Sequence, residues 1–176
     1  MMAELLDSLT FQSSANIPLR LSHFDMLELA TDIRDQYARL PDYGADFEID
    51  GESVMGHWDE GAMRRAIENL VNNAIKYGDG GAIKIMAQQT RGRMMLTVHN
   101  EGRPIPEDRR NPIFEYLHRE NFGSAAEGWG VGLPFVKAMA EAHGGSVTVD
   151  SSERLGTTFL IDVPVDCRPY VEELAA

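Results

Sequence analysis

The sequence contains a single cysteine, Cys167, among its 176 residues. An internal disulfide is therefore impossible, and this composition is typical of proteins from the reducing cytosol. No apolar run approaches the roughly 18 residues that a membrane-spanning helix needs, and the acidic N-terminal stretch does not resemble a signal peptide. We therefore expect a cytoplasmic domain that makes no membrane contact itself, whether or not a longer parent protein is membrane-anchored.

Basic residues are also scarce. Sixteen Lys and Arg stand against 28 Asp and Glu, which gives a net charge of −12. Nucleic acids require a basic surface, so the charge argues against a nucleic-acid partner, whereas a single nucleotide needs only a local site. The five histidines are scattered without paired spacing. A histidine-ligated metal centre is therefore not expected.

The hydrophobic pattern changes its period along the chain and predicts one α+β domain over residues 20–176. Hairpins replace regular βαβ alternation, which favours a two-layer α/β sandwich. Residues 1–19 read as the end of a preceding helix followed by a linker. Helical periodicity covers residues 25–40, 60–77 and 131–145, and strand-like alternation covers residues 45–50, 53–58, 81–90, 93–102, 146–152 and 156–164.

The segment from Arg64 to Gly81 has the spacing of an amphipathic helix but an unusual polar face. This face carries three asparagines, which are mediocre helix formers and together cost about 1–2 kcal/mol relative to alanine. The polar residues are Arg65, Asn69, Asn72, Asn73 and Lys76, and the apolar face carries Met63, Ala66, Ile67, Leu70, Val71, Ala74 and Ile75.

Amide oxygens are ligands that Mg²⁺ accepts, and they add no negative charge beside a triphosphate. Asn69 and Asn73 are i, i+4 neighbours, so both oxygens can point into one site, and Lys76 adds a cation for a phosphate oxygen. The alternative is a polar helix face that is merely rich in asparagine.

A glycine-rich run precedes the helix predicted near residue 131. Gly128, Gly130 and Gly132 alternate there, and such a run lets backbone N–H groups approach phosphate oxygens at the positive end of a helix. A tight loop that enters a helix is the alternative. A dinucleotide-binding fold is disfavoured, because no βαβ unit surrounds the run.

Together with "LTVHNEGRPIPEDRRNPIFEYLHRE" and "GTTFLIDVP", these segments resemble the catalytic, ATP-binding domain of bacterial sensor histidine kinases, a branch of the GHKL ATPase superfamily. The asparagine helix is similar to the family's N box, N-L-x-x-N-A-x-K followed by an aromatic residue or histidine. "NPIFEYLHR" is similar to the F box, "GWGVGL" to the second glycine box and "GTTF" to the last one. Four motifs in order span residues 20–165.

This resemblance implies the Bergerat fold, with a mixed, mainly antiparallel sheet, and a site for ATP and Mg²⁺. Asn73 would coordinate the metal and Asn69 would assist. Glu68 matches the general base of the superfamily's ATPases, or a polar assistant in kinases, and Arg119 would clamp a phosphate. Residues 107–127 would form a lid. The remaining implied nucleotide contacts are Lys76, Tyr77, Asn100, Gly102, Ile105, Phe114, Gly128, Gly130, Val131, Gly132, Leu133 and one of Thr157 and Thr158.

The first glycine box departs from the family pattern D-x-G-x-G. Asn100 replaces the aspartate that accepts a hydrogen bond from the adenine amino group, and Pro104 replaces the second glycine. A neutral amide oxygen still accepts this bond, although more weakly than a carboxylate does. Pro104 would stiffen the hinge into the lid. The alternative is that Asn100 simply closes a turn.

A phosphoacceptor histidine is not recognisable. His23 lacks the arginine and proline of the family's H-E-x-R-x-P-like sequence. The resemblance therefore implies the catalytic domain of a two-component sensor kinase, which transfers the γ-phosphoryl group of ATP to a histidine on a dimerisation and phosphotransfer domain outside this chain, for relay to a response regulator. The alternatives are a degenerate nucleotide-binding regulatory domain and a stand-alone ATPase or serine kinase with Glu68 as base.

Overall fold

The main sheet belongs to the part of the chain that the computed structural model describes, residues 18–40, 46–115 and 132–175. Within these ranges β2 pairs with β4 in parallel, and the other neighbouring strands are antiparallel. The predicted mixed, mainly antiparallel sheet is thus confirmed. The strand order is β2 (Phe47–Gly51), β4 (Gly78–Thr90), β5 (Arg93–Gly102), β7 (Gly156–Pro164) and β6 (Ser146–Ser152).

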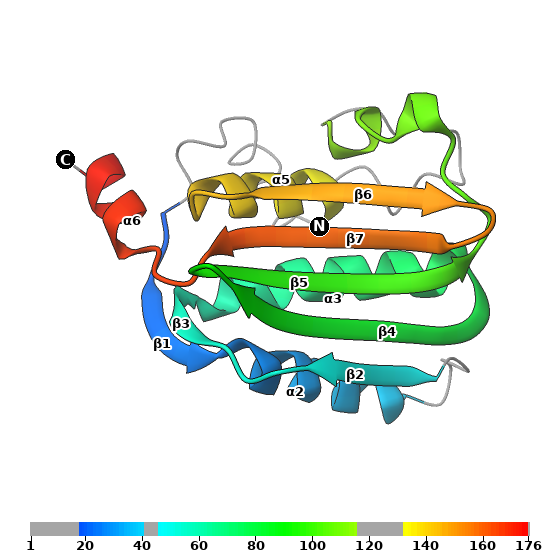
Figure 1. The fold of residues 1–176 in the computed structure, drawn as a ribbon, viewed down its shortest axis with the longest axis horizontal. Helices are drawn as coiled ribbons and strands as arrows, with labels where there is room; N and C mark the ends of the chain where they lie inside the picture. Colours follow the sequence, from blue (N-terminus) through cyan, green and yellow to red (C-terminus); the bar gives the residue numbers. More distant parts are fainter. Residues whose placement is uncertain (1–17, 41–45, 116–131, 176) are drawn as a thin grey trace, which may run out of the picture.

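Three longer helices cover one face of this sheet, which makes the predicted two-layer sandwich (Figure 1). Strands β1 and β3 form a separate antiparallel pair. None of the helices in the described ranges is both long enough and apolar enough to span a bilayer. The remaining elements are α2 (Met26–Ala38), α3 (Glu60–Tyr77), α5 (Gly132–Ala142), the C-terminal α6 (Arg168–Ala175), β1 (Leu21–Asp25), β3 (Met55–Asp59) and the short 3-10 turns η2 (Glu107–Arg109) and η3 (Pro112–Phe114).

The predicted elements appear near their expected bounds except at the start of β4, whereas strand β1 and helix α6 were not predicted from the hydrophobic pattern. Asp25 caps α2 by accepting a hydrogen bond from the Leu27 N–H at 2.9 Å. Strand β4 begins at Gly78, three residues earlier than its alternation indicates, because Gly78 pairs with Gly102 across a register shift that ends at Ile83. The glycine-rich segment between them lacks the period that reveals a strand. The predicted helix end at residues 2–13 lies outside the described residues.

Helix α3 packs its predicted apolar face on the sheet. Apart from Ile75, which is half-buried, the residues of that face are buried in the core. Alternate residues of β5 point toward the helices, so that Met94, Leu96 and Val98 are buried and their neighbours are not. The next residue in this alternation is Asn100, whose side chain therefore lies on the helix-facing side at the end of the strand. The strand period thus places a polar side chain in the inner layer.

The start of α3 is tied to α5 by a buried histidine. Asp59 caps α3 by accepting a hydrogen bond from the Ala62 N–H, and its own backbone N–H donates to His143 Nε2 at 3.1 Å. His143 Nδ1 donates to the Met139 carbonyl at 2.8 Å. Both bonds suit the neutral ring, since Nε2 must accept. Burial lowers the pKa of His143 below its ordinary value of 6.5, against opposing effects of the Met139 carbonyl and the Asp59 charge.

This histidine predicts a pH dependence of stability. Because the pKa of His143 is lower in the folded chain, the unfolded chain takes up a proton first as the pH falls. The contribution of His143 to the free energy of unfolding should therefore be constant above about pH 7. Below pH 6.5 the free energy of unfolding should decline, with a limiting slope of about 1.4 kcal/mol per pH unit. Urea unfolding at pH 7.5 and 5.5 measures it. His143→Gln should flatten this decline while the exposed His23→Gln leaves it intact, and an unaltered decline in His143→Gln contradicts the assignment.

Candidate functional site

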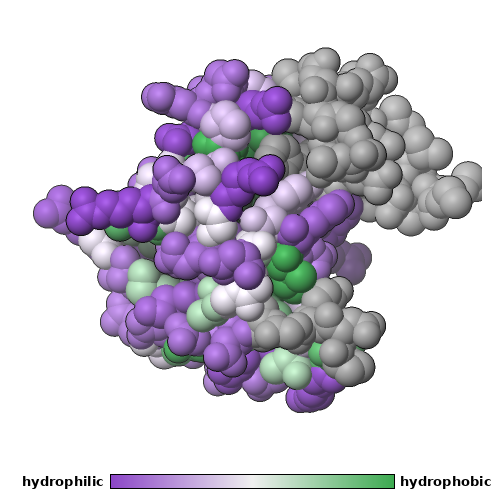
Figure 2. All heavy atoms as spheres, turned by 90° about the vertical axis from the view of Figure 1, so that its right-hand side faces the viewer, coloured by the Kyte–Doolittle hydropathy of each residue, from purple (hydrophilic) through white to green (hydrophobic). Residues whose placement is uncertain are grey.

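The end of β5, the start of β7 and the C-terminal end of α3 lie at the same end of the sheet (Figure 1). Residues from these three elements line a pocket there. The described residues on the outer surface at this end of the molecule are mainly hydrophilic (Figure 2). The pocket is open to solvent, and together with its opening it comprises about 280 Å³. Its lining consists of Asn73, Tyr77, Asn100, Arg103, Ile105, Thr157 and Phe159.

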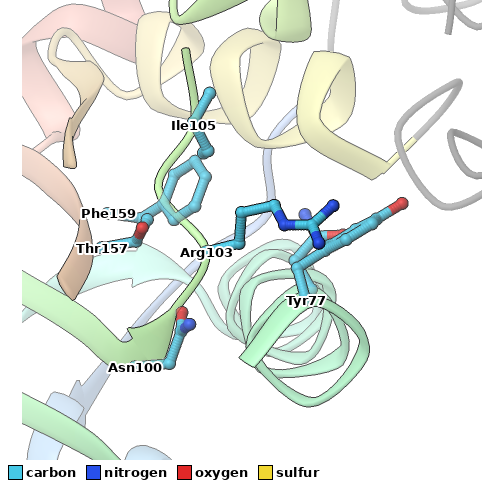
Figure 3. Close-up of a pocket in the computed structure, with 7 residues that line it drawn as sticks. Tyr77, Asn100, Arg103, Ile105, Thr157 and Phe159 are labelled. Atoms are coloured by element: carbon cyan, nitrogen blue, oxygen red, sulfur yellow. The ribbon is translucent and has the colours of Figure 1, made fainter. Parts of the chain in front are cut away.

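A row of polar side chains in register across three strands forms one wall of the pocket with two of its members and backs that wall with the third. Thr157 on β7 lies directly opposite Asn100 on β5 and also opposite Ser151 on β6. The three side chains are only 7%, 5% and 3% exposed for Asn100, Thr157 and Ser151. Figure 3 shows Asn100 and Thr157 on one side of the pocket and Tyr77 and Arg103 on the other. Polar groups this deeply buried need defined partners.

The Asn100 amide has one end occupied by the protein. Its Nδ2 donates a hydrogen bond to the Glu101 carbonyl at 3.0 Å. This bond holds the amide plane and leaves Oδ1 as the acceptor that Asn100 can offer to the pocket. Asn100 thus both bonds the neighbouring backbone and lines the pocket, and its binding role stays a prediction.

The choice between the two threonines is decided by the strand period. Thr157 lines the pocket, whereas Thr158 points to the opposite face, where its hydroxyl lies 2.7 Å from His99 Nδ1. Successive side chains of a strand point to opposite faces. Thr157 is therefore the threonine that lines the pocket and Thr158 is not, and a contact between Thr157 and a nucleotide stays a prediction.

The Asn73 side chain lies at the floor of the pocket. It is 6% exposed, and its Nδ2 is buried without a hydrogen-bond partner within the described part of the chain. An unsatisfied buried amide costs about 1–3 kcal/mol, and its nitrogen and oxygen exchange places by rotation of the side chain. An amide in this state fits a ligand that engages it, and the rotated form offers an oxygen to a cation.

The start of α5 comes close to α3 beside this amide. A Cβ added to Gly132 would lie 3.3 Å from Asn69 Oδ1, so glycine at this position permits the close approach. The structure thus brings together Asn69, Asn73 and the last residue of the predicted glycine run. Oxygen-bearing side chains next to a helix N-terminus are a donor set that fits Mg²⁺ and phosphate.

Asn72 has a different role from its two neighbours. It is exposed, and its Oδ1 accepts a hydrogen bond from the Tyr37 hydroxyl of α2 at 2.7 Å. This bond fastens α3 to α2. The asparagines of this helix face therefore do not all point to the same place, since Asn72 contacts α2 whereas Asn73 lines the pocket.

Other predicted residues surround the pocket at different depths. Tyr77 lines it, whereas Lys76 is exposed, with its ammonium 5.9 Å from the centre of the Tyr77 ring. Glu68 is half-buried on α3. Leu133 is fully buried in the core. Of these four, only Tyr77 belongs to the pocket lining.

The chain that leaves β5 closes one side of the pocket. Gly102 has a φ of 144°, and a Cβ there would lie 2.9 Å from the Tyr77 carbonyl, so only glycine fits beside the end of α3. Ile105 lines the pocket, and Phe114 stands edge-on to Phe159 with ring centres 6.0 Å apart. Phe114 therefore supports the wall rather than forming it. The other predicted contacts, Arg119, Gly128, Gly130 and Val131, lie outside the described residues.

Sequence reasoning missed Arg103, Phe159 and Ser151. Phe159 follows Thr157 by two residues and shares its strand face, so the alternation could have revealed it. Ser151 required the register of the β6–β7 hairpin. Arg103 carried no signal beyond its position next to Gly102.

Residues 58–166 match the family model described as "Histidine kinase-, DNA gyrase B-, and HSP90-like ATPase". This match covers more than half of the chain and includes all the residues that line the pocket. The chain belongs to this ATPase family. The resemblance predicted from the four motifs is thereby confirmed.

Individual relatives agree with this assignment. Sensor histidine kinase CusS of Escherichia coli O157:H7 is 30% identical over 170 residues, which are 93% of this chain and 35% of CusS. The solved catalytic domain of histidine kinase ThkA, in a nucleotide-free form, is 25% identical with a TM-score of 0.74, covering 85% of this chain and 98% of that domain. Full-length ShkA in complex with AMPPNP is 26% identical with a TM-score of 0.77, covering 92% of this chain and 34% of ShkA. The chain thus spans about a third of the length of CusS.

Proposed function

We propose that this ATPase-family domain binds ATP together with Mg²⁺ in the pocket between α3 and the β5–β7 end of the sheet. The observation that carries the proposal is that two buried asparagine amides line the same pocket and differ in their hydrogen bonding. Asn100 offers an acceptor at one wall, and the unpartnered Asn73 amide lies at the floor. A purine amino group and a metal–phosphate group are the ligands that these two positions suit.

Each part of the nucleotide has candidate partners on the chain. Asn100 and Thr157 would hold the base, and Tyr77 and Ile105 would border it. Asn73 and Asn69 would hold the metal, which when bound neutralises charge on the phosphates and orients them. The remaining proposed phosphate contacts are Lys76, Arg119, Gly128, Gly130, Val131, Gly132 and Leu133.

We further propose that the domain passes the γ-phosphoryl group to a histidine on a dimerisation and phosphotransfer domain, for relay to a response regulator. CusS is named a sensor histidine kinase, and this chain aligns with about a third of it. Transfer of this kind needs positioning and charge neutralisation more than covalent help from the protein. Glu68 is half-buried on α3 and would act as a polar assistant.

Calorimetric titration with a non-hydrolysable ATP analogue, with and without Mg²⁺, tests the first step. Binding that requires Mg²⁺ and is stronger than for the matching GTP analogue supports the proposal. The second step is tested by incubating the chain with ATP and the separately produced phosphotransfer domain of its parent protein. Phosphohistidine on that domain supports kinase activity, and absence of nucleotide binding under all conditions contradicts both steps.

A regulatory domain that binds nucleotide without phosphotransfer is the second candidate. It is favoured by Asn100, whose neutral amide replaces the family's carboxylate, and by Pro104 next to the hinge glycine Gly102. Mg²⁺-dependent binding combined with no phosphohistidine in the transfer experiment would support this candidate instead.

Asn100→Ala should weaken binding of the ATP analogue by about tenfold, because it removes one hydrogen bond to the adenine amino group from a buried site. The affinity for the GTP analogue should not change, because guanine has a carbonyl instead of an amino group at that position. Thr158→Val is the matched control, because Thr158 faces away from the pocket. Calorimetry measures the affinity of each variant for both analogues. An equal loss of affinity for the two analogues would mean that the base does not bind at Asn100.

A further inference from the structure

Ser151 is a buried serine that stands behind the pocket wall. It does not belong to the pocket lining, but its hydroxyl joins two residues that do. Ser151 Oγ accepts a hydrogen bond from the Ile105 N–H at 2.8 Å and lies 2.6 Å from Thr157 Oγ1. The side chain is 3% exposed. The proton of the Ser151 hydroxyl must therefore find its acceptor among these neighbouring groups.

The two bonds determine which hydroxyl donates. The backbone N–H of Ile105 can only donate, so Ser151 Oγ is an acceptor in that bond. If Thr157 donated to Ser151 as well, the Ser151 proton would need another acceptor in a closed environment. The favoured order runs from the Ile105 N–H to the Ser151 hydroxyl and from there to Thr157 Oγ1. In this order the Thr157 proton is free to point into the pocket.

Arg110 holds the same cluster from outside. Its Nε donates to the Ile105 carbonyl at 3.3 Å, and its guanidinium also donates to the Ser151 carbonyl. The chain that leaves β5 is thereby fastened to the end of β6 on both sides of Ser151. Because both carbonyls are held, the Ile105 N–H stays directed at the Ser151 hydroxyl, and the proton order is maintained by the backbone.

We propose that Ser151 is a positioning residue that keeps the Thr157 hydroxyl as a hydrogen-bond donor toward a ring nitrogen of the bound purine. This inference rests on the proposed function. It deepens it by assigning a donor beside the Asn100 acceptor, since the two residues are opposite each other in register. Ser151 itself does not touch the ligand.

The resulting pattern discriminates between purines. Adenine carries an amino donor next to an N1 acceptor, whereas guanine carries a carbonyl acceptor next to an N1–H donor. A wall with an acceptor at Asn100 and a donor at Thr157 complements adenine at both positions. Against guanine, the same wall sets acceptor against acceptor at Asn100 and donor against donor at Thr157. The hydroxyl order thus compensates for the neutral amide at Asn100 in selecting the base.

The test compares the ATP analogue with its 1-deaza counterpart, which lacks the N1 acceptor. In the unaltered chain with Mg²⁺, the 1-deaza analogue should bind about tenfold more weakly, the value of one hydrogen bond in a buried site. The ratio of the two affinities, ATP analogue over 1-deaza analogue, should fall to about one in Thr157→Val and to about twofold in Ser151→Ala. Ser151→Thr retains the hydroxyl and should therefore show the same affinity ratio as the unaltered chain. Ser152→Ala is the matched control, because the hydroxyl of Ser152 accepts a hydrogen bond from the Leu155 N–H within the hairpin turn.

The outcomes separate this inference from the proposed function. If Ser151→Ala weakens both analogues equally, Ser151 merely supports the fold and the inference is wrong. Equal binding of the two analogues to the unaltered chain also overturns it, while nucleotide binding itself stands. If neither analogue binds, the proposed function fails and the inference with it. Should Ser151→Ala not fold, as judged by thermal unfolding, Ser151→Cys takes its place, because a thiol is only a weak donor; it should also lower the ratio, and an unchanged ratio overturns the inference.

Discussion

Replacing Asn73 by alanine is expected to remove the Mg²⁺-dependent part of nucleotide binding. The affinity for the ATP analogue in the presence of Mg²⁺ should fall by about 100-fold or more, toward the value measured without the metal, since even residues that only support a metal ligand contribute about 10- to 100-fold. Asn73 is the buried amide without a partner at the pocket floor. The fold should survive, because the substitution removes an unsatisfied polar group rather than a contact.

Asn72→Ala is the control for this prediction. It changes the neighbouring asparagine of the same helix, whose Oδ1 accepts from the Tyr37 hydroxyl. This variant should lose about 0.5–1.5 kcal/mol of stability and bind the nucleotide normally. Calorimetry with and without Mg²⁺ measures both variants. Undiminished Mg²⁺-dependent affinity in Asn73→Ala would show that the metal is held by other residues.

Trp58→Ala should reduce the free energy of unfolding by about 3–5 kcal/mol, the largest loss of stability that we predict for a single substitution. Trp58 is fully buried, and its Nε1 donates to the Pro164 carbonyl at 2.8 Å. Phe24 stands edge-on to the indole at 5.4 Å between ring centres. The residue thereby joins β1, β3 and the end of β7 directly before α3 begins, so its loss leaves both a cavity and an unpaired carbonyl.

Urea unfolding at pH 7.5 measures this loss. Met55→Ala on the same strand is the control, because Met55 is 46% exposed and should cost less than about 0.5 kcal/mol. Trp58→Phe retains part of the ring volume and should lie between the two. A loss below about 1 kcal/mol in Trp58→Ala would mean that the β1–β3 pair contributes little to the stability of the domain.

The motifs predicted more of this protein than the hydrophobic pattern did. Periodicity located α2, α3, α5 and most strand boundaries, because helices and half-buried strands bury one face at a regular spacing. It failed at the start of β4, where glycines follow Tyr77 and provide no side chains to alternate. Family membership came from the order of four motifs, in which residue type and spacing are constrained together.

The sequence alone was sufficient for the family, the two-layer fold and the set of candidate nucleotide contacts, because these depend on residue identity and local spacing. The tertiary structure separated residues that look alike in the chain: Asn72 bonds Tyr37 while Asn73 lies in the pocket, and Thr158 faces outward while Thr157 faces inward. It also revealed Ser151, whose partners Ile105 and Thr157 meet it only across strands and through a backbone turn. The direction of a side chain and the identity of its distant partner depend on the packing of elements far apart in the sequence, and local spacing contains neither.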